Sequence, residues 1–138
     1  MREFNKKVGG LVTLQSAYGP KETMDLVLDE IKATGMRIFS RIDHSALAVE
    51  SGLELQPTEV VIFGNPRGGT PLMQASQTMG IDLPLKILVC QEACGKTWLS
   101  YNDPLWLAKR HGVKGVEHLA GVMSLALSAI AVKATKAT

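Results

Sequence analysis

The chain has 138 residues, 46% of them hydrophobic and 20% charged, a balance that is typical of a globular domain and excludes a disordered segment. Its 15 basic and 13 acidic residues are scattered and leave a net charge of +2, so nucleic-acid binding is not indicated. The chain starts without a secretory signal, and the apolar run 121–132 is too short to cross a bilayer, so we expect a cytoplasmic domain with no membrane partner.

Strand and helix patterns alternate in the first half of the chain. Residues 11–17 partly alternate apolar and polar side chains, as a half-buried strand does, and Pro20 opens a helix that Gly35 ends. Residues 36–42 predict a second strand, and one or two helical turns follow it. The β-branched run 58–63 predicts a third strand.

The second half of the chain begins with a helix and a hairpin. Thr70 as N-cap and Pro71 as first residue predict a helix over 70–79. Residues 84–91 and 96–101 predict two hairpin strands, and a short helix follows them. Because of the hairpin the sheet cannot be purely parallel. The predicted fold class is α+β, with a mixed, largely antiparallel sheet of about five strands and helices packed mainly on one face.

The chain divides into a flexible terminus (1–8), a single α+β domain (9–112) and a C-terminal segment (113–138) that forms a helix. This helix is apolar on two sides, so one side can cover the sheet and the other can meet a partner chain, which predicts a homodimer. Its first apolar side consists of Val116, Leu119, Met123, Leu127 and Ile130, and its second of Val122, Leu125 and Val132.

The loop FGNPRGGTP, residues 63–71, is the candidate binding site. A glycine-rich turn before a helix presents free backbone N–H groups around Gly68, Gly69 and Thr70, which favours an anion, and Arg67 can add a charged hold. The lysine and the glycine spacing of a nucleotide-hydrolysing loop are missing. The alternative is a tight connection in which the glycines relieve backbone strain and Asn65 bonds its own turn.

Three titratable residues could lie near this loop. His44 is the best candidate for an acid or base at neutral pH, and Asp43 and Asp103 could assist it. A second interpretation is that both aspartates only cap the helices that follow them. An enzyme would therefore need His44 within reach of an aspartate and of an oxyanion site at Gly68 and Gly69.

The cysteines and the remaining histidines predict neither a metal nor a cofactor. Cys90 and Cys94 form a C-x3-C pair without a second ligand pair, and glycines interrupt the segment between His111 and His118. We expect Cys90 to be buried and Cys94 to lie exposed in a hairpin turn, both reduced.

A set of motifs between Arg41 and His111 resembles a known family, the bacterial and archaeal domain of unknown function 302. The motifs are Phe63-Gly64-Asn65-Pro66, Gly69-Thr70-Pro71-Leu72-Met73, Asp82-Leu83-Pro84-Leu85, Trp98-Leu99-Ser100-Tyr101-Asn102-Asp103-Pro104 and Leu107-Ala108-Lys109-Arg110-His111. The resemblance implies a small α+β domain that often associates, and it implies no reaction or ligand.

The sequence thus predicts a small module that binds an anionic metabolite or has a regulatory role, acting as a homo-oligomer. The alternatives are a small enzyme that uses His44 and a purely structural oligomerising domain. The predicted ligand-binding residues are Asp43, His44, Asn65, Arg67, Gly68, Gly69, Thr70 and Asp103.

Overall fold

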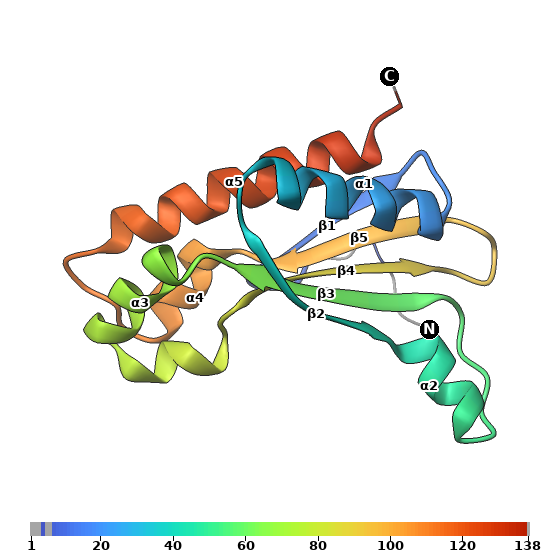
Figure 1. Cartoon of the computed structure of the whole chain (residues 1–138), viewed down its shortest axis with the longest axis horizontal. Coiled ribbons are helices and arrows are strands. Elements are labelled where there is room, and N and C mark those ends of the chain that lie inside the picture. The colour runs from blue at the N-terminus through green and yellow to red at the C-terminus, as the bar shows by residue number, and fades with distance from the viewer. Residues whose placement is uncertain (1–3, 5–6, 138) are drawn as a thin grey trace.

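A single antiparallel sheet, in the strand order β1-β5-β4-β3-β2, organises the molecule (Figure 1). The computed structural model describes residue 4 and residues 7–137 of the chain. Its elements are β1 (Leu11–Ser16), α1 (Pro20–Ala33), β2 (Arg37–Asp43), α2 (His44–Glu50), β3 (Thr58–Gly64), α3 (Pro66–Ala75), the 3-10 helix η1 (Gln77–Ile81), β4 (Leu85–Gln91), β5 (Thr97–Asn102), α4 (Pro104–Arg110) and α5 (Glu117–Thr135).

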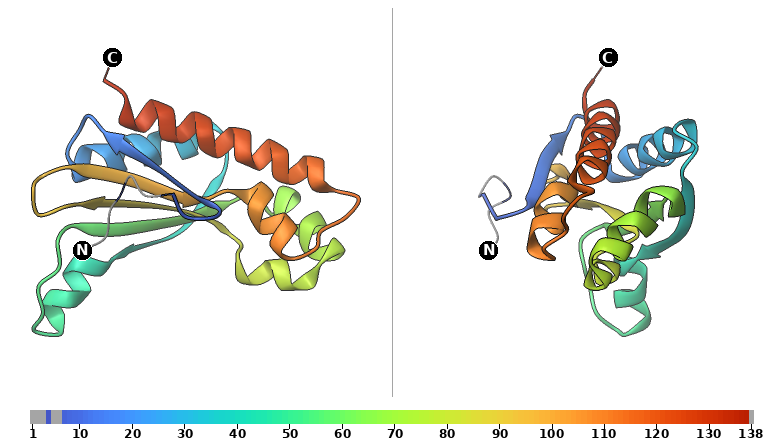
Figure 2. Two further views of the ribbon diagram at one scale, coloured as in Figure 1. Left: turned by 180° about the vertical axis from the view of Figure 1, so that it is seen from behind. Right: turned by 90° about the vertical axis from the view of Figure 1, so that its left-hand side faces the viewer.

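Helices α1 and α5 lie side by side across one face of this sheet (Figures 1 and 2). In α1, Met24, Val27 and Ile31 recur at helical spacing and are fully buried. They meet alternate residues of the strands, such as Phe63 of β3 and Leu99 of β5. The predicted α+β class is confirmed, with helices packed mainly on one face, and every pairing between these strands is antiparallel.

The shorter helices lie at the two ends of the sheet (Figure 1). At one end α3, η1 and α4 enclose a second, smaller core in which Leu72, Met79 and Leu107 are buried. At the other end α2 projects away from the sheet. The two ends therefore differ in how much apolar surface they can bury.

Helix α3 begins at Pro66, five residues before the predicted first residue Pro71, so the prediction of Thr70 as N-cap is wrong. Asn65 is the N-cap, its Oδ1 accepts the N–H of Arg67 at 3.0 Å, and Pro66 is the first helical residue. Pro71 lies inside the helix. Both Asn65-Pro66 and Thr70-Pro71 carry the signal of a helix start, and the earlier pair is the one that the helix uses.

Strand β2 is at an edge of the sheet and carries an irregularity. The pairing with β3 shifts register between Ile38 and Ser40, which leaves Phe39 as an extra residue in the strand. Ile38 packs against the main core, whereas Phe39 is 43% exposed. A bulge of this kind turns one side chain away from the alternating pattern.

The C-terminal helix α5 packs against α1 and the sheet and buries Leu127, Ile130, Ala131 and Ala134. Within the described part of the chain it is the one helix long and apolar enough to cross a membrane by length and composition, a test that core helices also pass. The expected flexible terminus, residues 1–8, lies largely outside the described residues, and the domain boundaries stay a prediction.

Candidate functional site

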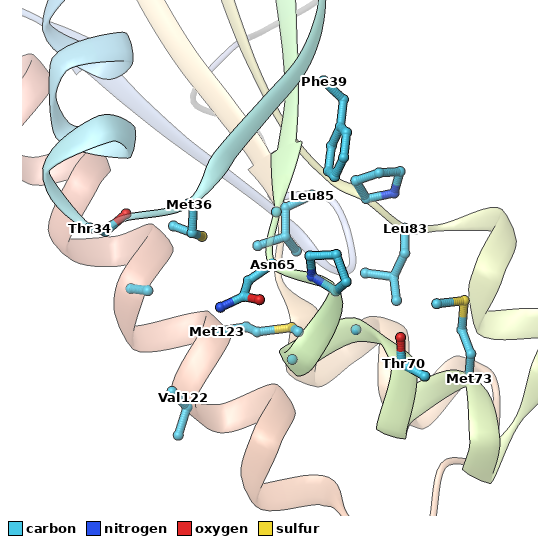
Figure 3. A pocket seen from close by; sticks show the side chains of 16 residues that line it. Thr34, Met36, Phe39, Asn65, Thr70, Met73, Leu83, Leu85, Val122 and Met123 are labelled. Carbon is cyan, nitrogen blue, oxygen red and sulfur yellow. The ribbon is translucent and has the colours of Figure 1, made fainter.

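A pocket of about 400 Å³ opens where the end of β3 enters α3, with α5 along one side (Figure 3). We call it the apolar pocket. Its lining comes from four separate parts of the chain: Thr34, Met36, Phe39, Gly64, Asn65, Pro66, Gly68, Gly69, Thr70, Met73, Leu83, Pro84, Leu85, Val122, Met123 and Ala126. These residues include no charged side chain, so the chemistry of the wall suits uncharged groups better than charged ones.

Three methionines give the apolar pocket an adaptable wall. Met36 enters from the start of β2, Met73 from α3 and Met123 from α5 (Figure 3). Methionine has three rotatable bonds and a polarisable sulfur, so such walls adjust to ligands of different shape. The irregularity in β2 brings Phe39 to the same pocket, because the regular strand pattern would not place it there.

Asn65 is the main polar group of the apolar pocket. Its side chain points into the pocket between Met36 and Met123 (Figure 3). Because the Oδ1 atom accepts the Arg67 N–H, the orientation of the amide is fixed, and the Nδ2 group is left to donate hydrogen bonds. The pocket can therefore recognise a hydrogen-bond acceptor.

The backbone amides that the sequence assigned to an anion have partners within the chain. The N–H groups of Gly68 and Gly69 both donate to the Asn65 carbonyl, at 2.9 and 3.0 Å. Arg67 is exposed and is not part of the pocket lining. Four residues of the loop that the sequence singled out line the pocket: Asn65, Gly68, Gly69 and Thr70.

Asp43 and His44 lie at the opposite end of the sheet, where α2 begins (Figure 1). Asp43 caps α2: its Oδ1 accepts the Ala46 N–H at 2.9 Å and the Ser45 hydroxyl at 2.6 Å. The Ser45 hydroxyl and then the Ala46 amide stabilise the carboxylate and lower its pKa. This position separates His44 from the Gly68–Gly69 turn, so the geometry that the enzyme alternative requires is not met.

Asp103 is also a helix cap. Its Oδ1 accepts the Leu105 N–H at 3.0 Å and the Ser124 hydroxyl at 2.8 Å, which ties the start of α4 to α5. Asp103 does not line the apolar pocket. The eight residues predicted as one site therefore fall into three places.

A second pocket, of about 520 Å³, lies between α1, the end of β2 and the start of β3, and we call it the polar pocket. It contains Asp43 and two ion pairs. Arg41 holds Glu59 through two hydrogen bonds of 3.1 and 3.2 Å, and Lys21 bonds Asp25 at 3.0 Å. Four of the charges of this pocket are thus paired with one another, and Asp43 is held by the start of α2.

The sequence analysis missed a cluster around Asp82, which we call the Asp82 brace. The Asp82 Oδ2 accepts His111 Nε2 at 2.6 Å and Arg110 Nη1 at 2.9 Å, and His111 Nδ1 bonds the Thr78 hydroxyl at 2.9 Å. The His111 side chain is 8% exposed. The brace fastens the segment before β4 to the end of α4. In the sequence, Asp82 and His111 appeared only as members of two of the motifs that resemble the family.

The cysteines behave as two unlike thiols. Cys90 is buried and Cys94 is exposed, and burial raises the pKa of the Cys90 thiol, with the Glu92 charge adding to the effect. In the part of the chain that the structure describes, no three His, Cys, Asp or Glu side chains gather as a metal site requires.

Comparison with known proteins adds a family, a fold and a set of relatives. Residues 12–130 match the family described as "Domain of unknown function DUF302". The crystal structure of an uncharacterised conserved DUF302 protein from Bacillus stearothermophilus superposes with a TM-score of 0.82, covering 92% of this chain and 99% of that one. At 20% identity it supports the fold alone.

The curated relatives carry a different description. A protein of Brucella suis biovar 1 (strain 1330) named fluoride-specific ion channel FluC 1 is 50% identical over 104 residues, which is 75% of this chain and 41% of that protein. A Brucella abortus protein of the same name matches equally, over 38% of its length. The chain thus spans about two fifths of these relatives, and more than half of each lies outside the match.

Proposed function

The chain belongs to the DUF302 family, whose name states no activity, and we propose that it is a binding module for a small, mainly apolar ligand with one hydrogen-bond acceptor. The observation that carries the proposal is the apolar pocket of about 400 Å³ beside Asn65. Ligand pockets typically enclose about 300–1,000 Å³ and combine apolar walls with a few fixed polar groups.

The wall chemistry supports an apolar ligand over the phosphate-like anion that the loop alone predicted. Burial of apolar ligand surface against Met36, Leu85 and Met123 contributes about 25 cal/mol per Å² removed from water. The amides of Gly68 and Gly69 are occupied by the Asn65 carbonyl, so an anion would find few free donors in that turn. A carbonyl or carboxylate oxygen can instead accept from Asn65 Nδ2.

Thermal shift and isothermal titration calorimetry with methyl octanoate, octanoate and inorganic phosphate test this proposal. Methyl octanoate should raise the melting temperature, because a ligand at 100 times its Kd stabilises the folded state by about 2.7 kcal/mol. Octanoate should raise the melting temperature less, because no charged side chain lines the pocket to offset the desolvation of its carboxylate, and phosphate should leave the melting temperature unchanged. Stabilisation by phosphate alone would contradict the proposal.

A cavity-filling variant locates the binding. Ala126 lines the apolar pocket from α5, so Ala126→Phe should fill the pocket and reduce the affinity for methyl octanoate at least tenfold. Ala75→Phe is the matched control, because Ala75 is exposed at the end of α3 and is not part of the lining. Equal binding by both variants would place the ligand elsewhere.

A second candidate function follows from the Brucella relatives: an accessory module of a fluoride channel. Those proteins are named fluoride-specific ion channels, and this chain matches only about two fifths of each. We propose that the matched segment adjusts the activity of the rest. Fluoride efflux from liposomes that contain the Brucella suis protein, with and without that segment, tests the idea, and an unchanged rate and unchanged expression would contradict it.

A further inference from the structure

Helix α5 carries a second apolar surface that faces away from the core of its own chain. We call it the α5 stripe: Val122, Leu125, Ala129 and Val132, with His118 at one end and Lys136 just beyond the other end of the helix. These residues follow one another at spacings of four and three, which is the spacing of a helix seam that packs on another helix. Val122 is 62% and Leu125 is 75% exposed.

The surroundings of the α5 stripe extend it and allow close approach. Leu105 of α4, itself 46% exposed, lies against Gly121, so the exposed apolar surface continues from α5 onto α4. Ser128 and Ala129 are small and exposed at the middle of the stripe. Small side chains let two helices approach to about 8 Å, and larger ones then pack into the gaps.

The two ends of α5 carry opposite charges. Glu117 lies in the first turn, and Lys133 lies in the last turn with Lys136 just after it. Lys133 is already 3.6 Å from Glu30, which leaves Lys136 as the main cation beside the stripe. When two such helices run in opposite directions, each Glu117 comes near the lysines of the other helix, and the helix dipoles also oppose one another favourably.

We propose that the α5 stripe is the docking surface for a second copy of this chain, with the two α5 helices antiparallel. Val122 then faces the second copy's Val132, and Leu125 faces the second copy's Ala129. The Leu125–Ala129 pair sets a large side chain against a small one, the Val122–Val132 pair joins two side chains of equal size, and a two-fold axis repeats every contact. The self-complementary charges and sizes are the reason for choosing a second copy as the occupant.

The proposal is independent of the ligand, and it has a consequence for the apolar pocket. Val122 belongs both to the α5 stripe and to the pocket lining. The second copy's Val132 would therefore lie at the rim of the pocket and make it more closed than it is in a single chain.

Sedimentation velocity of the full chain at 1–100 µM, an ordinary range for a specific dimer, tests the docking. The wild-type chain should sediment as a dimer, and Leu125→Arg should be monomeric, because a charged side chain would be buried in the seam. Val49→Arg is the matched control: Val49 is 71% exposed on α2, so this variant should stay dimeric. A monomeric wild type, or a dimer that survives Leu125→Arg, would overturn the proposal.

A charge exchange tests the direction of the helices. Glu117→Lys and Lys136→Glu should each weaken the dimer several-fold, and the double variant should regain most of the wild-type affinity. Additive losses in the double variant would overturn the antiparallel arrangement.

Crosslinking tests the register directly in a Cys94→Ser background, which removes the exposed native thiol. Leu125→Cys with Ala129→Cys should oxidise to a covalent dimer, because residue 125 of one copy faces residue 129 of the other. Leu125→Cys alone should crosslink poorly. Efficient crosslinking of the single variant would mean that residue 125 faces its own copy, as in parallel helices or an antiparallel pair centred on residue 125, and would overturn the proposed register.

Discussion

The two ends of the sheet carry pockets of similar size and opposite chemistry. The apolar pocket, about 400 Å³, has methionine, leucine and proline walls, whereas the polar pocket, about 520 Å³, contains Arg41, Glu59, Lys21 and Asp25. Each carboxylate of those two ion pairs already has a cation beside it. Charge alone is therefore a poor guide to a binding site in this protein, since paired charges leave little for a ligand.

The two pockets also differ in how well water can solvate their walls. Water can fill the polar pocket and bond its charged walls at little cost, whereas water in the apolar pocket finds few partners. An apolar pocket next to an oriented hydrogen-bond donor, Asn65, is the feature that a ligand would stabilise.

The largest loss in the free energy of unfolding should come from truncating an apolar side chain in the wall of the apolar pocket. Leu85 lines the apolar pocket and is 5% exposed, so Leu85→Ala should lower the free energy of unfolding by about 2–5 kcal/mol. Urea denaturation measures this value. A loss below about 1 kcal/mol would mean that the wall of this pocket contributes little to the core.

The Asp82 brace should give the next largest effect. His111→Ala leaves the partly buried Asp82 without its closest partner and should cost about 1–3 kcal/mol. Arg110→Ala is the control, because Arg110 is 54% exposed and its pair with Asp82 should contribute at most about 1 kcal/mol. Equal losses in urea denaturation would show that His111 has no special role in bracing η1.

At the polar end, loss of an ion pair should matter less. Glu59→Gln removes the partner of Arg41, and since Arg41 is 47% exposed the cost should be at most about 1 kcal/mol. The difference between wild type and variant should shrink in roughly 1 M salt, where charges are screened beyond about 3 Å. A difference that is large and independent of salt would indicate a packing role for Glu59 instead.

The smallest effect should be the acid response of α2. Because the pKa of Asp43 is lowered from 3.8, its capping contribution is fully present above pH 3.8 and is lost as the pH falls through the lowered value. The Ala46 amide resonance in NMR spectra should follow this titration, since Ala46 N–H bonds the carboxylate. In Asp43→Ser the cap does not titrate, so the same resonance should stay still.

Much of the fold follows from local patterns in the sequence. The signals at Pro20 and Gly35 predict the bounds of helix α1 closely, and the β-branched run of β3 and the hairpin of β4 and β5 also lie near their predicted bounds. The start of α3 was missed because two Asx/Thr-Pro signals lie five residues apart. Local pattern cannot rank two adequate caps, because the surrounding packing decides between them.

Only part of the lining of the apolar pocket could be predicted from the sequence, for a different reason. Asn65, Gly68, Gly69 and Thr70 belong to the loop that the sequence selected, but Met36, Leu83 and Met123 come from distant segments. Spacing along the chain carries no information on which of those side chains meet. The same holds for Asp82 and His111, which are 29 residues apart and become partners only through the tertiary fold.

The register shift between Ile38 and Ser40 bears on whether a further strand can pair with this edge of the sheet. β2 is an edge strand of the sheet. Its register shift interrupts the row of backbone N–H and C=O groups with which another strand would have to pair. Arg37 adds a positive charge on the same edge strand. Pairing of a further strand along β2 is therefore disfavoured.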